Sequence, residues 1–297
     1  SDIARRYDLG YDELREANPH VDPWLPGVGT RVVLPTRFVL PPGPRKGVVL
    51  NVPEMRLYYY PPARRGRPRE VVTYPVGIGR EGWQTPVGVT RIVARIPNPA
   101  WYPPASIRKE HAADGDALPR YVPPGPDNPL GRFALQLGVP GYLIHGTNRP
   151  YGVGMAVSHG CVRLYPEDIR ALFDAVRVGT KVRLVHELYK VGWQGGKLYL
   201  GAHRPLTPQG AARALNLTPV VRLLVDAVRR HPGYAVDWDR VRRLLERPPG
   251  IPVPVGVGDP GLHATLAAAV PIAAAPDADA QKKKLAPQAR GVRDAGS

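Results

Sequence analysis

The sequence predicts a mainly β domain with one clear helix, placed between a small helical unit and a C-terminal extension. Three observations lead to this prediction. From Gly47 onward, short runs of β-type residues alternate with Pro and Gly turns. Between Pro166 and Val176, apolar residues instead recur at helical spacing after a proline that suits a first helical turn. A Pro-rich segment at 41–44 separates the β-rich part from the unit before it.

The first unit, residues 1–36, is predicted to hold two short helices and a strand. Apolar residues recur at helical spacing around 3–7, and a second helix is expected from about Asp12 until Asn18-Pro19 ends it. The run at 31–34 predicts a strand that Pro35 closes. Residues 37–46 are expected to form a linker.

The β-rich domain is expected to span residues 47–187. Residues 97–130 are rich in Pro, Gly and Asp and predict a long irregular loop, which is either disordered or functional at such a length. The predicted strands are 48–51, 56–60, 70–76, 87–96, 133–137, 142–144 and 181–185.

The C-terminal extension, residues 188–255, shows weaker patterns. A hairpin is expected around Gly195-Gly196, and amphipathic helices are expected at 219–230 and 238–247, the second capped by Asp237. From 256 to 297 the chain is rich in Ala, Pro and Lys without periodicity, and we expect disorder there.

Composition limits the possible functions. The 297 residues are 43% hydrophobic and 22% charged, which is typical of a soluble globular protein, and no apolar run is long enough to cross a membrane. A net charge of +16 favours a polyanionic partner. The sequence has no zinc-finger or aromatic RNA-binding signature, so we expect no nucleic-acid partner. A single cysteine excludes an intrachain disulfide.

That cysteine lies in the segment that carries candidate chemistry. Cys161 is preceded by His159, and His145 lies sixteen residues earlier. A thiol becomes a good nucleophile as thiolate, and a nearby imidazole can remove its proton. If 159–161 is extended, His159 and Cys161 share a face, while His145 approaches from a neighbouring strand. The amide of Gly160 or of Cys161 is a candidate donor to an oxyanion.

These residues resemble the YkuD-type L,D-transpeptidase signature, in which His-Gly-Thr is followed by Ser-His-Gly-Cys-[Ile/Val]-Arg. Here the two segments are 145–147 and 158–163. The resemblance covers the domain from about 47 to 187 and includes VVLNVPEMRLYYY, GIGREGWQTPVGVT and PDNPLG. It is strongest to the ErfK/YbiS group, and it implies a sandwich- or barrel-like β fold with one helix.

The resemblance implies that Cys161 attacks the carbonyl of the third residue of a peptidoglycan stem tetrapeptide, usually diaminopimelate, and releases D-alanine. His145 would be the general base, oriented by the backbone carbonyl of Gly146. His159 would lie beside the thiolate, and Gly160 would shape the oxyanion site. We expect an amine to resolve the acyl-enzyme. The lysine of an outer-membrane lipoprotein is the favoured acceptor, and a second stem would instead give 3–3 cross-links. Water as the acceptor would give hydrolysis.

Five further residues are expected to contact substrate. Arg163 is a candidate partner for a substrate carboxylate. Thr147 and Ser158 belong to the two signature segments, although such residues also serve as hydrogen-bonding turn residues. Trp101 and Tyr102 lie in the 97–130 insertion, which would be a lid over the donor site.

The first unit resembles a LysM module, a βααβ unit that binds glycans containing N-acetylglucosamine. The resemblance rests on IARRY, DELREANP and LPGVGTRVVLP, and it covers the two helices and the last strand but not the first strand. Peptidoglycan glycan is therefore an expected partner. The alternative to a LysM-like module is a helical hairpin without a glycan-binding function.

Other interpretations stay open. A zinc site made by His145, His159 and Cys161 lacks a fourth ligand at typical spacing, so we expect no metal and no cofactor. NlpC/P60 endopeptidases place the cysteine before the histidine, the reverse of the order here. An idle wall-binding protein is the alternative from another class. We expect a periplasmic enzyme that carbapenems inhibit, exported by a signal peptide outside this sequence.

Overall fold

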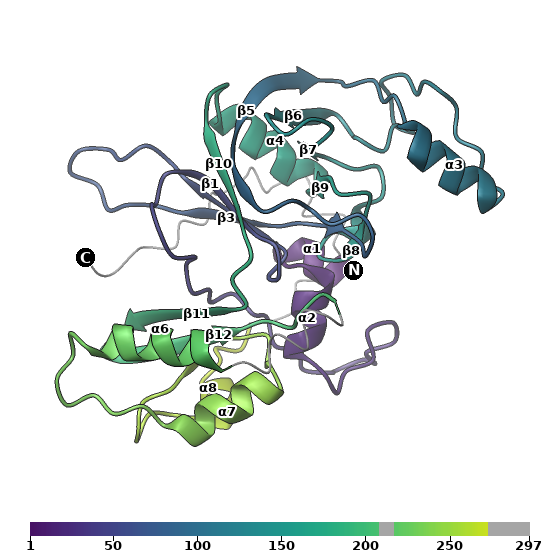
Figure 1. Ribbon diagram of the computed structural model, residues 1–297. Coiled ribbons are helices and arrows are strands. Elements are labelled where there is room, and N and C mark those ends of the chain that lie inside the picture. The colour runs from purple at the N-terminus through teal and green to yellow at the C-terminus, as the bar shows by residue number, and fades with distance from the viewer. Residues whose placement is uncertain (208–216, 273–297) are drawn as a thin grey trace.

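The computed structural model describes residues 1–207 and 217–272, and Figure 1 shows how their helices and strands are arranged. The main sheet has eight strands in the order β3-β2-β1-β10-β5-β6-β7-β9. Its strands are β1 (Gly47–Asn51), β2 (Arg56–Tyr60), β3 (Val72–Pro75), β5 (Gly88–Pro97), β6 (Phe133–Leu137), β7 (Leu143–His145), β9 (Val162–Arg163) and β10 (Lys181–Val185). A mainly β domain is thus present, as the turn-separated β-type runs predict.

The pairing of this sheet sets where the signature segments meet. Most neighbouring strands are antiparallel, but β1 runs parallel to β10 and β7 runs parallel to β9. The last pair places Ile144 opposite Val162 and His145 opposite Arg163. A two-stranded sheet of β4 (Ile78–Gly79) and β8 (Ala156–Ser158) lies beside this edge.

Helix α4 (Pro166–Ala175) covers one face of the sheet. Its buried Ile169, Leu172 and Phe173 pack against strand residues such as Leu135 and Ile144 in the main hydrophobic core. The hydrophobic cluster on the opposite face is smaller. There the linker residues Phe38 and Leu40 pack against Tyr58 and its neighbours. The helical spacing seen in the sequence therefore identifies a true core helix.

The first unit contains α1 (Asp2–Arg6) and α2 (Tyr11–Ala17), as expected. The strand expected at 31–34 is not formed. The side-chain amide of Asn18 donates to the carbonyl oxygen of Val33 at 2.8 Å, and the Val33 amide donates back to Asn18 Oδ1 at 2.7 Å. A side chain thus satisfies the backbone groups that a partner strand would have paired, and the LysM-like architecture stays a prediction.

The segment 97–130 departs from the expected irregular loop, because it contains helix α3 (Ala105–Ala113). Its sequence ASIRKEHAA consists largely of good helix formers, and Pro103-Pro104 precedes it. The surrounding Pro and Gly residues concealed this local preference. Buried Asn128 holds the rest of the segment, donating to the carbonyl oxygens of Pro99 and Pro123 at 2.9 and 3.0 Å.

The C-terminal part forms a sheet-and-helix unit with its own hydrophobic core. The predicted hairpin is present as β11 (Tyr189–Gln194) and β12 (Lys197–Ala202), and β13 (Val253–Pro254) extends it to three strands. Helices α6 (Thr218–Val228) and α7 (Trp238–Glu246) cover this sheet (Figure 1), and Asp237 caps α7 by accepting from the Arg240 amide at 2.9 Å.

The prediction of disorder after 256 is wrong for residues 256–272. This stretch includes helix α8 (Leu262–Ala267), which contacts β13. The apolar side chain of Leu262 packs against the core of this unit, which composition alone did not reveal. Residues 273–297 lie outside the described part of the chain. No helix within the described ranges is long and apolar enough to cross a membrane.

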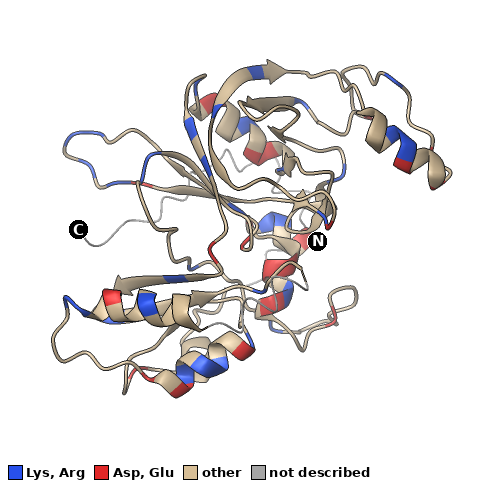
Figure 2. Ribbon diagram, in the orientation of Figure 1, with Lys and Arg blue, Asp and Glu red and all other residues tan. Residues whose placement is uncertain are grey.

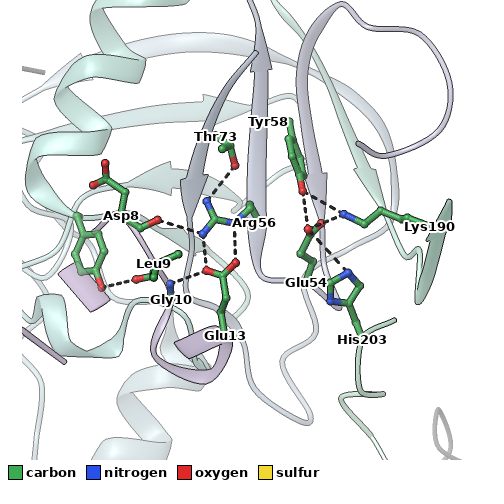
Figure 3. Close-up of polar contacts among 11 residues, drawn as sticks. Asp8, Leu9, Gly10, Glu13, Glu54, Arg56, Tyr58, Thr73, Lys190 and His203 are labelled. Carbon is green, nitrogen blue, oxygen red and sulfur yellow. Dashed lines mark hydrogen bonds and ion pairs between the residues drawn. The ribbon is translucent and has the colours of Figure 1, made fainter. Parts of the chain in front are cut away.

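Buried charges link the first unit, the main sheet and the C-terminal unit (Figure 3). Arg56 of β2 pairs with Glu13 of α2 and donates to the carbonyl oxygen of Asp8 at 3.1 Å. Glu54 of the β1–β2 turn pairs with Lys190 of β11 at 2.6 Å, and the Lys190 and Arg56 side chains are each only 1% exposed. Largely buried ion pairs therefore connect the three parts.

Candidate active site

Cys161 lies in a tight bend between β8 and β9 and not on an extended strand. Gly160 has φ +102°, a conformation that L side chains rarely adopt, and a Cβ there would meet Tyr142 at 2.9 Å. The extended conformation that would place His159 and Cys161 on one face of a strand is therefore not formed. The bend turns His159 toward helix α3 and leaves the Cys161 thiol partly buried next to β7.

The bend is held by its own hydrogen bonds. The Ser158 hydroxyl donates to the Cys161 carbonyl oxygen at 2.5 Å and accepts from the Gly160 amide at 3.2 Å. Thr85 donates to the Gly160 carbonyl oxygen at 2.9 Å. Of the two amides considered for an oxyanion, that of Gly160 is therefore engaged in the bend, which leaves the Cys161 amide as the better candidate. The Ser158 hydroxyl shapes the bend, and its contact with substrate stays a prediction.

His145 ends β7, the strand next to β9, as the sequence predicts. Its Nδ1 lies 2.6 Å from the Gly146 carbonyl oxygen, which is the contact expected for Gly146. A carbonyl can only accept, so Nδ1 carries the proton and Nε2 is left as the basic nitrogen. Burial, reinforced by the charge of Arg163, lowers the pKa of His145 to about 3, although hydrogen bonds with the Gly146 and Leu130 backbones oppose this fall. The imidazole is therefore neutral in the resting protein.

The Cys161 thiol donates to the Gly141 carbonyl oxygen at 3.7 Å, and no hydrogen bond joins it to His145 among the described residues. Burial raises the pKa of the thiol, although the Leu143 backbone and the Arg163 charge oppose that rise. The resting pair is accordingly a neutral thiol and a neutral imidazole. The resting site therefore does not contain a thiolate–imidazolium ion pair.

Arg163 lies on β9, two residues after Cys161. Its positive charge acts on both Cys161 and His145. Burial lowers the pKa of its guanidinium, and its Nε is buried without a hydrogen-bond partner among the described residues. Guanidinium nitrogens that lack partners are costly to bury. The unpaired Nε therefore offers a donor for a carboxylate near the thiol.

His159 sits in a cluster that the sequence analysis did not find. Its Nε2 lies 3.2 Å from the Arg80 guanidinium and 3.3 Å from Glu110 Oε2, and Arg80 also forms an ion pair with Glu110. The Trp83 ring meets the His159 ring edge-on at 5.1 Å, and the His111 ring lies 5.8 Å away. Glu110 and His111 belong to α3, so the insertion reaches the site through this helix.

The Nε2 of His159 faces two different partners. The Arg80 guanidinium can only donate and the Glu110 carboxylate can only accept, so Nε2 accepts from Arg80 in one tautomer and donates to Glu110 in the other. Burial and then the Arg80 charge lower the pKa of His159 to about 4, which keeps the ring neutral. Arg80 and Trp83 lie in the segment GIGREGWQ, which contributes to the family resemblance, and nothing in the sequence around His111 indicates that it lies near Cys161.

The remaining candidates lie farther along the signature and the insertion. Thr147 is buried, and its hydroxyl accepts from the Arg149 amide at 2.9 Å, a turn contact. Trp101 exchanges backbone hydrogen bonds with Val122 inside the insertion. Tyr102 is 69% exposed and packs against Tyr121, with ring centroids 5.2 Å apart. In the described part of the chain, no side-chain hydrogen bond or ring contact joins these three to Cys161 or His145, and their contacts with substrate stay predictions.

Within the described ranges, no three His, Cys, Asp or Glu side chains come together in an arrangement that could hold a metal ion. The chemistry that the site offers is that of a thiol, a neutral base oriented by a carbonyl, a backbone amide and a neighbouring guanidinium. These are the parts that acyl transfer through a thioester requires.

Several known proteins are similar to this chain. The family model YkuD, described as "L,D-transpeptidase catalytic domain", matches residues 45–184. A protein of Salmonella typhimurium (strain LT2) described as "Probable L,D-transpeptidase ErfK/SrfK" is 42% identical over 268 residues, 88% of this chain and 83% of that protein. "Probable L,D-transpeptidase YbiS" of Escherichia coli (strain K12) is 39% identical over 255 residues, 84% of this chain and 81% of that protein. Among solved structures, the "Ldtfm-avibactam carbamoyl enzyme" matches with 18% identity and a TM-score of 0.37, over 48% of this chain and 50% of that chain.

Proposed function

Because the chain belongs to the L,D-transpeptidase family, of the ErfK/YbiS kind, we propose that Cys161 is its acyl-carrying nucleophile and His145 its general base. The contact that best supports these roles is the hydrogen bond from His145 Nδ1 to Gly146, at 2.6 Å. It leaves Nε2 as the only basic nitrogen of the ring, on the strand that pairs with the one following Cys161.

The first half-reaction forms a thioester. Cys161 Sγ attacks the carbonyl carbon of the third residue of a peptidoglycan tetrapeptide stem, and His145 Nε2 takes the thiol proton. The Cys161 amide donates to the oxyanion. The C–N bond to D-alanine then breaks, and the protonated His145 returns the proton to the leaving amine. Arg163 is proposed to hold a substrate carboxylate, since its buried Nε has a donor to offer.

The second half-reaction passes the acyl group to an amine. The acceptor nitrogen attacks the thioester carbon, His145 takes its proton, and the C–S bond breaks to regenerate the thiol. By resemblance to the ErfK/YbiS group we favour the lysine amine of an outer-membrane lipoprotein, with a second stem or water as the alternatives. The proposed setting is the periplasm, with the first unit acting as a LysM-like glycan contact.

We further propose that α3 acts as a lid over this site. Its Glu110 is in contact with both Arg80 and His159, so the helix is joined to the residue that lies two positions before the nucleophile. Closing a site in this way excludes water, which would otherwise compete with the acceptor amine. His159 is proposed to support the oxyanion or the substrate.

The test of the catalytic roles is the intact mass of the protein after incubation with a carbapenem, for wild type and for Cys161→Ala. We expect one covalent adduct on wild type and none on the variant, because the β-lactam carbonyl should acylate Cys161. No adduct on folded, reduced wild-type protein would contradict the assignment and favour the idle wall-binding alternative.

The acceptor requires a separate measurement. Wild-type protein is incubated with a tetrapeptide stem donor and equal amounts of a peptide ending in lysine and of a second stem, and the products are resolved by mass spectrometry. A dominant lysine-linked product supports lipoprotein attachment. A dominant stem–stem product, or release of D-alanine without a new amide, would replace that choice by cross-linking or by hydrolysis.

A further inference from the structure

A cavity of about 290 Å³ lies where the first unit, the main sheet and the C-terminal unit meet. Its walls come from α2, from the β1–β2 turn, from the segment after β12 and from residues 250–252. Neither Cys161 nor His145 nor His159 lines it, so it is separate from the candidate active site. Figure 3 looks onto part of its wall, where Glu13, Glu54, Lys190 and His203 lie close together.

Most charges on this wall already have partners. Glu54 accepts from Tyr58 at 2.5 Å and pairs with Lys190 at 2.6 Å. Glu13 pairs with Arg56 and accepts from the Gly10 amide at 3.0 Å. Separating either ion pair would be costly, because the remaining partner would be a buried, uncompensated charge. They are not free to hold a ligand.

Two other polar groups of the cavity are poorly satisfied. The Glu16 side chain is only 18% exposed, and its ion-pair partner, Arg204, lies 3.6 Å away with a side chain that is 58% exposed. The Nε2 of His203 is buried without a hydrogen-bond partner among the described residues, and it lies 3.9 Å from Glu54, beyond hydrogen-bonding distance. The Nε2 of His203 is thus closed off within the wall, whereas the Glu16 carboxylate, held only by the exposed Arg204, suits a ligand that brings N–H donors and positive charge.

Guanidinium groups line the same cavity. Arg37 is exposed there and donates to the Tyr199 hydroxyl at 3.3 Å, and Arg204 stands on the side of Glu16. Arginine side chains bind carboxylates with a planar pair of donors. The cavity therefore presents a carboxylate and guanidinium groups together, and its volume is at the lower end of the range for small-molecule sites, which is roughly 300–1,000 Å³. Figure 2 shows acidic and basic residues side by side on α2, which lines this junction.

We propose that this cavity binds the zwitterionic end of an amino acid, with the ammonium group on Glu16 and the carboxylate on Arg204 and Arg37. A stem peptide that contains diaminopimelate carries such an end, so the cavity would hold a stem away from the catalytic thiol. That identification of the source rests on the proposed function. The recognition chemistry rests on the cavity itself.

The experiment is isothermal titration of the Cys161→Ala protein with free diaminopimelate, which removes turnover while keeping the cavity. Pimelate, which lacks both amines, and cadaverine, which lacks both carboxylates, are the ligand controls. We expect measurable binding of diaminopimelate only. Glu16→Gln in the same background should weaken it by about tenfold or more, because one charge-assisted contact is lost. Glu246→Gln makes the same change on exposed α7, outside the cavity, and should leave the affinity unchanged.

Arg204→Gln provides a second variant whose exposed side chain poses little risk to folding, and it should also weaken binding. Binding of cadaverine or pimelate as tight as that of diaminopimelate would overturn the zwitterion assignment. Equal affinity in Cys161→Ala and in both cavity variants would overturn the site itself. Failure of the carbapenem adduct on wild type tests the catalytic proposal instead, so the two failures are distinguishable.

Discussion

Glu16 gives the sharpest prediction on stability. Burial raises its pKa from 4.5 to about 7 in the folded protein, while the charge of Arg204 opposes this rise only in part. A carboxyl group with a raised folded pKa favours the folded state below its unfolded pKa, and this contribution is lost as pH rises through the folded pKa. The loss should therefore develop between about pH 4.5 and about pH 7 and stay constant above.

The magnitude follows from the two pKa values. Moving the pKa of one carboxyl from 4.5 to about 7 corresponds to about 3 kcal/mol of unfolding free energy. Glu16→Gln removes the ionisation but keeps the shape of the side chain. We expect the unfolding free energy of this variant, minus that of wild type, to increase by about 3 kcal/mol between about pH 4.5 and about pH 8.

Urea unfolding followed by both circular dichroism and tryptophan fluorescence measures this difference, and coincident transitions would justify a two-state treatment. Glu246→Gln, the same change at an exposed position of α7, is the matched control. A flat difference for Glu16→Gln would show that the carboxylate ionises in the folded protein without a burial cost. That result would refute the reasoning for an unsatisfied acid in the cavity.

Three other outcomes are expected. Lys190→Met should lower the unfolding free energy by about 3–5 kcal/mol in urea, because it leaves Glu54 charged and buried without its cation, 2.6 Å away in wild type. Glu110→Gln should speed amide hydrogen exchange in α3 as measured by mass spectrometry, while Glu81→Gln, an exposed change nearby, should not. Alkylation of resting Cys161 by iodoacetamide should be slow at about pH 7 and accelerate with pH, because the thiol pKa is raised; a fast rate that does not change across this range would contradict a neutral resting thiol.

The strands and the core helix were predictable because their signals are local. Turn-separated β-type runs and the helical spacing of Ile169, Leu172 and Phe173 need no long-range information, and the structure has these elements within one or two residues. The strand at 31–34 failed for the opposite reason. Its residues have β propensity, but a strand also needs a partner, and the side chain of Asn18 takes that place for Val33.

The site was predictable in its signature and not in its surroundings. The resemblance around Cys161 and His145 implied a contact between His145 and the Gly146 carbonyl, and the structure has that contact. The catalytic roles of Cys161 and His145 stay predictions. The cluster of Arg80, Glu110 and His159 joins three distant segments, and none of these residues stands out alone. The bend at Gly160 was likewise hidden, since a glycine can serve an extended strand as well as a turn.

The burial of ionisable groups has three different outcomes in this chain, and comparing them explains why the cavity is the place to look for a ligand. Glu54 is buried but keeps its charge, because Lys190 and Tyr58 contact it directly. His145 is buried and becomes neutral, which a general base can use. Glu16 has neither a close partner nor a catalytic use, and at neutral pH it is divided between its two protonation states. An ammonium ion in the cavity would supply the missing charge, so ligand binding and the stability contributed by this side chain should be coupled.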